Sequence, residues 1–226
     1  MDVGEKMKKM LRRTLNEARY IYHVLAGKDV PAIIKWYHDK GDDRLRIDYE
    51  LNENSVVFDV GGFKGEWSEL ISRRYDPYIY VFEPVAKFYE KLVAKFKGNK
   101  KIKVYNVALS DQNVKKDICV VGEGSSIYRT EGSKTQTQLQ DIYSFITQNK
   151  IKKIDLIKIN IEGGEFVLLE RMIKKGIVEM CSDIQVQFHE FYPNSKSLYS
   201  HLHDQLTKTH HLTYLYPFIW ENWKRN

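Results

Sequence analysis

Four polar residues that could move protons or hold a ligand stand close together in the segment KINIEGGEF. The segment follows the apolar run IDLI, and alternate residues of a strand share a face, so Lys158, Asn160 and Glu162 should point to one side. Glu165 should fall in the first turn of the next helix, where a carboxylate favours the positive end of the helix dipole, so its position has a structural explanation. The sequence therefore predicts Lys158, Asn160 and Glu162 as candidate catalytic residues.

A histidine in a second apolar run could complete an acid–base centre. His189 lies in IQVQFHEF, on the same face as Gln185 and Gln187 if the run is a strand. If this strand lies beside that of Glu162, a His–Glu pair could take a proton from an attacking hydroxyl, because histidine titrates near neutrality. Asn160, Glu162 and His189 could instead hold a divalent metal ion, but the ligand set is thin and we favour acid–base chemistry without a metal.

A glycine-rich turn earlier in the chain could bind a nucleoside cofactor. In VVFDVGGFKGEWS, three glycines would let a ligand approach the backbone where a helix begins. A dinucleotide motif G-x-G-x-x-G that ends at Gly65 would require glycine at position 60, where Val60 stands. The charge of Asp59 would also oppose a pyrophosphate, whereas it suits the ammonium group of S-adenosylmethionine, a ligand without phosphate.

An acidic residue 24 positions after Asp59 supports the same cofactor. Glu83 ends the run YIYVFE, where it could accept both hydroxyls of a ribose. A third run ends in NVALSD, and there Ser110 and Asp111 could face the adenine, although Asp111 could equally just open a turn. We therefore predict S-adenosylmethionine rather than a nicotinamide or flavin, bound by Asp59, Gly61, Gly62, Phe63, Gly65, Glu83, Ser110, Asp111 and Asn160.

The lysine in the first segment should have a charged partner. Burying a lysine in a central strand costs several kcal/mol unless a carboxylate or hydrogen bonds accompany it. Asp59, Glu83 and Glu162 are the candidate partners of Lys158. A structural ion pair and a catalytic role are equally compatible with the sequence of this segment.

The elements that must position these residues alternate between strands and helices. This alternation predicts a mainly parallel sheet covered by helices on both faces. The polar stretch 121–138 interrupts the pattern and is predicted to be a loop or small hairpin over the sheet edge. The predicted strands are 55–60, 78–83, 102–109, 154–161 and 184–191, and the predicted helices are 65–75, 86–96, 139–149, 165–175 and 195–208.

The composition excludes several classes of protein. The chain has 226 residues, enough for one sizeable domain, with 42% hydrophobic and 29% charged residues. No apolar run approaches the roughly 18 to 20 residues of a membrane span, and no signal peptide is evident, so we expect a cytoplasmic protein. Cys119 and Cys181 lack metal-site spacing and should be inert core thiols. The net charge of +6 weakly favours an anionic partner.

Residues 5–27 are predicted to form an amphipathic helix that ends at Gly27. One face is apolar, with side chains at steps of three and four. The opposite face could contact phosphates or anionic lipid, which would allow peripheral membrane contact, or could simply be solvated. Its basic residues are Lys8, Lys9, Arg12, Arg13 and Arg19.

The ordered series FDVGGFKG, VFEP, NVALSD, SSI and IDLIKINIEGGE, over roughly residues 54–190, resembles the FkbM-type family of class I, S-adenosylmethionine-dependent methyltransferases. The resemblance implies a three-layer, Rossmann-like α/β fold with a mostly parallel seven-stranded sheet in the order 3-2-1-4-5-7-6. It implies a methyltransferase domain over residues 51–226, whose last two strands come from 210–224, after an N-terminal helical extension over 1–50. Asn160 stands where the family more often has aspartate.

The resemblance also implies an acceptor. The sequence is similar to a bacterial branch with KINIEGGE, QFH and WENWK that is associated with surface-polysaccharide biosynthesis, so we expect O-methylation of a sugar hydroxyl on a nucleotide-, lipid- or glycan-linked substrate, with His189 or Glu162 as the base. Trp220 and Trp223 could line the acceptor site or pack at the sheet edge. A nucleic-acid methyltransferase is the alternative, which the scattered lysines and arginines disfavour. A second alternative is a non-catalytic partner of a glycosyltransferase, which the intact cofactor motif disfavours.

Overall fold

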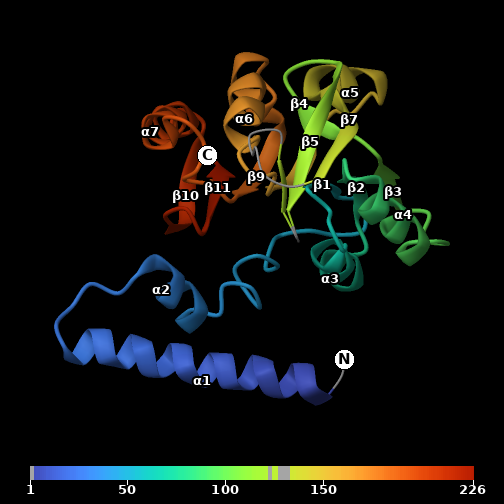
Figure 1. Cartoon of the computed structure of the whole chain (residues 1–226). Helices are drawn as coiled ribbons and strands as arrows, with labels where there is room; N and C mark the ends of the chain where they lie inside the picture. Colours follow the sequence, from blue (N-terminus) through green and yellow to red (C-terminus); the bar gives the residue numbers. More distant parts are fainter. Residues whose placement is uncertain (1–2, 122–123, 127–132) are drawn as a thin grey trace.

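A seven-stranded sheet forms the centre of the protein, and the computed structural model describes residues 3–121, 124–126 and 133–226. The strand order β3-β2-β1-β8-β9-β11-β10 matches the predicted order when these strands are numbered along the chain. β11 runs antiparallel to both of its neighbours, and the other pairs are parallel (Figure 1). The predicted fold is confirmed. The strands are β1 (Val56–Val60), β2 (Tyr78–Phe82), β3 (Ile102–Tyr105), β8 (Ile154–Ile159), β9 (Cys181–Val186), β10 (His210–Tyr216) and β11 (Trp220–Arg225).

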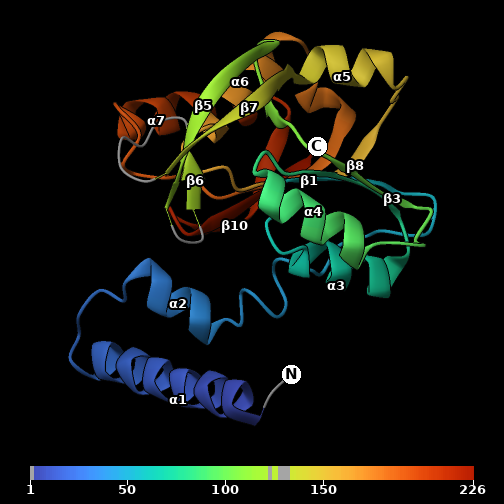
Figure 2. The ribbon, with the colours of Figure 1, turned by 45° about the vertical axis from the view of Figure 1, so that its right-hand side comes forward.

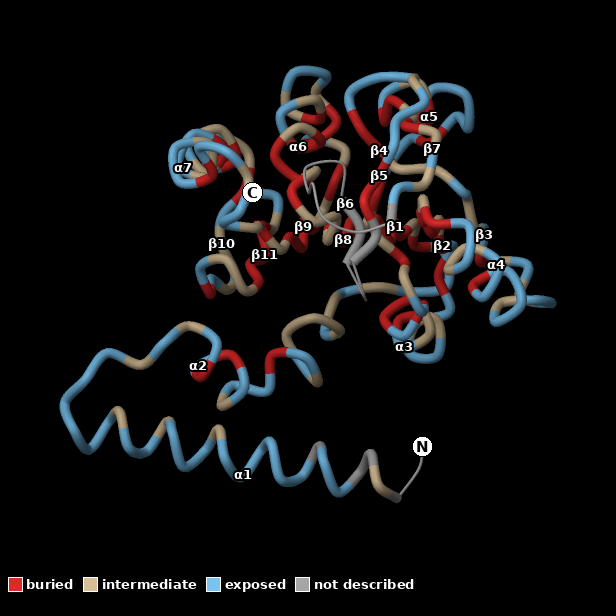
Figure 3. The backbone as a smooth tube through the Cα atoms, in the orientation of Figure 1, coloured by how far each residue is buried: buried red, intermediate tan, exposed pale blue. Residues whose placement is uncertain are grey.

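Helices cover both faces of this sheet and complete the three layers (Figure 2). Side chains of α5, α6 and α7 pack with Phe58 and Ile157 on one face, whereas those of α3 and α4 pack with Val57 and Leu156 on the other. Adjacent strand residues therefore enter different cores, as the alternation of side chains along a strand requires. Buried residues concentrate in the central strands (Figure 3). The helices are α3 (Glu66–Tyr75), α4 (Ala86–Lys95), α5 (Ile142–Gln148), α6 (Glu165–Lys174), α7 (Ser195–Leu206) and the short 3-10 helix η1 (Val178–Met180).

A second sheet, in the order β4-β7-β5-β6, departs from the sequence prediction. The predicted strand 102–109 breaks after Tyr105, and its last residues enter the second sheet as β4. The described residues of the stretch 121–138, predicted to be a loop or small hairpin, belong to strands β5, β6 and β7, and β5 pairs antiparallel with both of the others. The sequence of these strands is mostly polar, although Ile118, Cys119, Thr137 and Leu139 are buried. The strands are β4 (Ala108–Ser110), β5 (Val114–Val121), β6 (Gly124–Ser126) and β7 (Ser133–Asp141), while Ile127 of the SSI motif lies outside the described residues.

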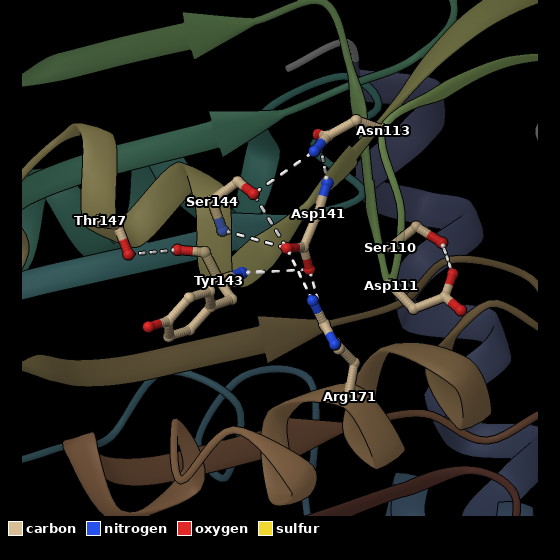
Figure 4. A network of polar contacts seen from close by, with 8 residues as sticks. All are labelled: Ser110, Asp111, Asn113, Asp141, Tyr143, Ser144, Thr147 and Arg171. Carbon is tan, nitrogen blue, oxygen red and sulfur yellow. Dashed lines mark hydrogen bonds and ion pairs between the residues drawn. The ribbon is translucent and has the colours of Figure 1, made fainter.

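A polar network ties the second sheet to two helices of the main layer (Figure 4). Asp141, the last residue of β7, caps α5 by accepting hydrogen bonds from the backbone N–H groups of Tyr143 and Ser144. Both oxygens of Asp141 also accept from Arg171 of α6, at 2.8 and 2.9 Å. Burial alone would raise the pKa of the Asp141 carboxyl, but the hydrogen bonds from Arg171 and Ser144 bring this pKa below its usual value. The network therefore fixes how the second sheet sits over α6.

The segment before β1 packs on the edge of the main sheet through its second half. Trp36 in α2 (Ala32–His38) is 1% exposed and contacts Tyr214, Tyr216 and Trp220. α1 (Val3–Leu25) packs against α2 and is exposed along most of its length (Figure 3). Within the described part of the chain, no helix has the length and apolar character needed to cross a membrane. Residues 32–50 therefore share a core with the sheet, whereas α1 reaches it through α2.

Candidate active site

A cavity opens at the carboxyl ends of β1, β2 and β8, where ligands of open parallel sheets bind. It encloses about 910 Å³ of empty space, counting open solvent at its mouth. The second sheet closes one side of the cavity with residues of β4, β5 and β7. The predicted site residues in its wall are Gly61, Phe63, Glu83, Ser110, Asn160 and Glu162.

The glycine turn leaves β1 in a shape that excludes a side chain at Gly61. Its φ is +91°, and an added Cβ would lie 2.0 Å from the backbone oxygen of Asn160. The N–H groups of Gly61 and Gly62 both donate to the carbonyl of Phe82, at 3.0 Å each. These amides therefore do not face the cavity, as they would in a turn that cradles a pyrophosphate. The geometry suits a nucleoside ligand without phosphate.

The two other glycines of the motif serve packing rather than the cavity wall. An added Cβ on Gly62 would lie 2.3 Å from the side chain of Val81, and one on Gly65 would lie 2.6 Å from Leu92 of α4. Gly65 also has a φ of +70° and directly precedes α3. These glycines let the turn pack closely against β2 and α4, so they affect the cavity only through the position of the turn.

Glu83 is fixed at the end of β2 by the turn that it faces. Its two carboxylate oxygens accept the N–H groups of Phe63 and Val85, at 2.8 and 2.9 Å. The residue is only 4% exposed, and burial raises the pKa of its carboxyl above the usual value while these hydrogen bonds oppose the shift. Each oxygen keeps a further lone pair, so the carboxylate can accept two ribose hydroxyls. Phe63, at a φ of +47°, packs edge-on against Phe88 beside it.

Asp59 and Lys158 form a buried ion pair behind the turn. Lys158 Nζ lies 2.9 Å from Asp59 Oδ1 and also donates to the carbonyl of Gly61 at 2.7 Å, while Ser68 donates its hydroxyl to Asp59. Burial lowers the pKa of Lys158, and the Asp59 carboxylate opposes this shift. Of the three candidate partners, the structure selects Asp59 for Lys158. Neither residue belongs to the cavity wall, so the pair reaches a ligand through the position of Gly61.

The NVALSD segment divides at its last two residues. Ser110 at the end of β4 is 7% exposed and lines the cavity. Its hydroxyl donates to Asp111 Oδ1 at 3.1 Å, as Figure 4 shows. Asp111 is exposed and stands outside the cavity wall. Ser110 is therefore the better placed of the two for contact with an adenine.

Of the candidate catalytic residues, Lys158 lies on β8 as predicted, whereas Asn160, Glu162 and His189 lie in loops. β8 ends at Ile159, so Asn160 and Glu162 follow it, and β9 ends at Val186, three residues before His189. After β8 the chain turns into α6, and Glu162 adopts a left-handed φ of +51° at that turn. The two loops still meet as expected, since His189 Nε2 lies 3.6 Å from Glu162 Oε1. Asn160 and Glu162 line the cavity, and His189 is not among its lining residues.

Glu165 contributes more than the sequence indicated. It is fully buried, and its Oε1 accepts both the backbone N–H of His189 at 2.8 Å and the ring Nδ1 at 2.9 Å. Its Oε2 accepts the N–H of Gly163 at 2.8 Å. One carboxylate therefore joins the two loops of the site. Sequence reasoning missed this role because the position of Glu165 in the first turn of a helix already had a structural explanation. The feature of the sequence that could have indicated it is a glutamate directly after a double-glycine turn.

These contacts define what the histidine can do. The buried Glu165 carboxylate accepts from Nδ1, which assigns the ring proton to that nitrogen and leaves Nε2 as an acceptor on the side of Glu162. An imidazole held in this way can take a proton at Nε2, and the resulting cation would lie between two carboxylates. Among the described residues, no three His, Cys, Asp or Glu side chains are grouped as a metal site. The arrangement suits proton abstraction from a hydroxyl.

Comparison with known families assigns the fold and the cavity to one group of proteins. The domain described as methyltransferase FkbM matches residues 59–216, which is most of the chain. The chain belongs to the FkbM methyltransferase family. The match starts after the extension proposed for residues 1–50 and includes every predicted site residue. No curated protein matches the chain.

Solved methyltransferase structures resemble this chain at low sequence identity. A methyltransferase FkbM from Methylobacillus flagellatus is 11% identical with a TM-score of 0.55, and the match covers 86% of this chain and 53% of that one, so the chain spans about half the length of that protein. An rRNA methylase from Streptococcus thermophilus is 11% identical with a TM-score of 0.47, covering 77% and 89%. M. capricolum TrmK, in complex with S-adenosylhomocysteine, is 13% identical with a TM-score of 0.45, covering 78% and 65%. At 11% identity, the similarity to the first structure shows a shared fold only. The TM-scores of the other two structures are below 0.5 and are too low to show a shared fold.

The match to the FkbM methyltransferase domain supports S-adenosylmethionine as the methyl donor. The residues at the cavity fit this cofactor. Glu83 offers carboxylate lone pairs to a ribose, and the Gly61 turn has no room for a side chain and no amide turned toward a phosphate. In the cavity wall, Phe63 contributes an apolar side chain and Ser110 a polar one. The contacts of the individual residues with the cofactor stay predictions.

Replacing Glu83 by glutamine is expected to weaken S-adenosylmethionine binding by roughly 10- to 100-fold, because the amide cannot accept both ribose hydroxyls and its NH2 group opposes a backbone N–H. Titration calorimetry with S-adenosylmethionine or S-adenosylhomocysteine measures the effect. Asp117→Asn, the same change at an exposed position of β5, serves as the control and should bind as the wild type does. Equal affinities of the two variants would remove Glu83 from the cofactor site.

Proposed function

We propose that this methyltransferase acts on a sugar hydroxyl during glycan or polysaccharide biosynthesis, with the sugar carried on a nucleotide, a lipid or the glycan itself. The observation that carries the proposal is the His189–Glu162 contact beside the cofactor cavity, with Glu165 holding the other ring nitrogen. A hydroxyl is a poor nucleophile until it loses its proton, so an O-methyltransferase benefits from such a base. The sugar as the carrier of the hydroxyl is supported by the sequence resemblance.

In the proposed reaction the bound cofactor supplies an electrophilic methyl group. His189 Nε2 takes the proton of the acceptor hydroxyl while the oxygen bonds to the methyl carbon and the carbon–sulfur bond breaks. Glu162 in the cavity wall holds the acceptor near Nε2, and together with Glu165 it stabilises the imidazolium that forms. Lys158 acts through Asp59 and the Gly61 carbonyl, so it is a positioning residue. Alignment of the reacting atoms supplies most of the remaining acceleration.

Asn160 completes the cavity wall between the cofactor turn and Glu162. Its backbone N–H donates to Val60 at 3.0 Å and its own carbonyl blocks a side chain at Gly61, so it fixes the spacing of β1 and β8 at the site. An amide at this position can donate and accept hydrogen bonds but cannot serve as a base. We propose that Asn160 orients the cofactor or acceptor and takes no proton.

Deleting the gene in its source organism tests the acceptor class. Mass spectrometry of the purified glycans should show one methyl group missing from one sugar, and reintroducing the wild-type gene should restore it. A gene that carries Glu83→Gln should restore it weakly. Modified nucleosides from total RNA, measured in the same strains, are expected to stay unchanged. Intact glycans together with a missing RNA methyl group would replace the proposal by the nucleic-acid alternative.

A further inference from the structure

Helix α1 turns its polar side toward the rest of the protein. Tyr20 stacks on the ring of His38 in α2 with centroids 3.7 Å apart, and Glu17 lies 3.1 Å from the same imidazole. Arg13 pairs with Asp43 in the segment that follows α2. The contacts that hold α1 in place are therefore ion pairs and a ring stack rather than an apolar core.

The apolar side of α1 faces solvent. Residues at steps of three and four share a face of a helix, and here they form a continuous apolar surface. Each is far more exposed than a side chain that packs against its own domain: Met7 65%, Leu11 60%, Leu15 55%, Tyr22 58% and Leu25 81%. A contiguous apolar face of this kind on an otherwise polar helix indicates an interaction surface.

The charge beside this face selects the partner. The sequence of α1 holds six lysines and arginines against two glutamates. Lys8, Arg12 and Arg19 are exposed and fall along one flank of the apolar face, while the side chain of Lys9 lies outside the described set. Of the described α1 side chains, Glu17 is the one carboxylate, and it faces His38. The exposed flank is therefore basic.

We propose that α1 docks on an anionic lipid surface, with its apolar face in the boundary between headgroups and acyl chains and its basic flank at the lipid phosphates. Apolar burial and charge attraction then act on the same side of one helix. A second copy of the chain fits this face less well. Antiparallel pairing would set the Lys8–Arg19 flank of one helix against the same flank of the other. Among the described α1 side chains the one carboxylate, Glu17, lies on the side that faces His38 and not on this flank.

Flotation of the full-length protein with lipid vesicles tests the proposal. The protein should float with vesicles rich in phosphatidylglycerol at low salt, bind pure phosphatidylcholine weakly and dissociate as salt rises, because charge attraction is screened. Lys8→Gln, Arg12→Gln and Arg19→Gln together should lower the affinity on the order of 100-fold, at about fivefold for each charge. The change Leu11→Ser with Leu15→Ser should abolish flotation.

A matched control separates the flank of α1 from net charge. Lys150→Gln, Lys152→Gln and Lys174→Gln remove the same charge from exposed positions on the main domain and should leave flotation unchanged. Equal losses in both triple variants, or full flotation of the leucine variant, would overturn the proposal. A dimer in analytical ultracentrifugation that Leu11→Ser with Leu15→Ser dissociates would assign the face to a second copy instead. None of these measurements depends on methyl transfer or on the acceptor.

Discussion

Replacing His189 by alanine is expected to lower kcat for methyl transfer by roughly 100- to 10,000-fold while the affinity for S-adenosylmethionine stays unchanged. The variant removes Nε2, which we propose as the proton acceptor, but it leaves the cavity wall intact because His189 is not one of the lining residues. Steady-state kinetics with a glycan acceptor identified from the deletion strain give kcat, and calorimetry gives the cofactor affinity. A loss confined to kcat distinguishes a base from a residue that only shapes the cofactor site.

Three further variants sharpen this test. His201→Ala removes an exposed histidine of α7 and should keep full activity. Glu162→Gln keeps the size of the side chain but loses its charge, so it should also lower kcat. Glu165→Gln should raise the fraction of wrongly oriented imidazole and reduce kcat without removing the histidine. Wild-type turnover in both His189→Ala and Glu162→Gln would show that the base lies elsewhere.

Replacing Lys158 by methionine is expected to lower the free energy of unfolding by about 3 to 5 kcal/mol, because it strands the Asp59 carboxylate in the core without its cation. Asp59 is fully buried, and Ser68 is its one other side-chain partner in the contacts described above. Urea denaturation followed by tryptophan fluorescence measures the change. Such a loss is a large share of the stability of a typical domain, which is roughly 5 to 15 kcal/mol.

The double variant Asp59→Asn with Lys158→Met keeps this prediction testable even where the single variant folds poorly. It removes both charges, and the amide oxygen introduced at position 59 can still accept the Ser68 hydroxyl, so much of the lost stability should return. Lys153→Met, at an exposed position near the start of β8, should change the free energy of unfolding little. The prediction would be wrong if the losses of unfolding free energy of the two single variants added up in the double variant, or if Lys158→Met left the urea midpoint unchanged. Either result would show that the two buried charges do not stabilise each other.

The aromatic residues near the end of the chain show where local sequence was ambiguous. Trp220 and Trp223 could have lined an acceptor site, but Trp223 is fully buried against His203 and Trp220 packs under Arg46 with its centroid 4.1 Å away. Neither lines the cofactor cavity. The two predicted core thiols, Cys119 and Cys181, are buried as expected. The apolar character of these residues predicted that they would be buried. Whether a buried side chain packs in the core or lines a ligand site depended on which element lies opposite it in the fold.

The second sheet was the largest part of the fold that the sequence did not predict. β5 and β7 carry lysines, threonines and glutamines, and even the buried position Thr137 is polar, so the apolar alternation is weak and the sequence resembles a polar loop. The break after Tyr105 was equally invisible, since IKVYNVAL is apolar enough for one continuous strand. This sheet nevertheless closes the cavity with Ser110, Ile118 and Leu139, so this side of the cavity wall could not be predicted from the sequence.

The sequence by itself determined the strand order through family resemblance, the kind of cofactor, and the segments of the chain that contain the site residues. Those properties follow from short motifs such as the Asp59 turn and Glu83, whose chemistry is local. Only the tertiary structure decided that Lys158 pairs with Asp59, 99 residues away, and that Glu165 holds His189 across 24 residues. Sequence spacing cannot choose among several carboxylates of the same charge. The choice is made by strand register and loop geometry, which bring one pair of atoms within hydrogen-bond distance.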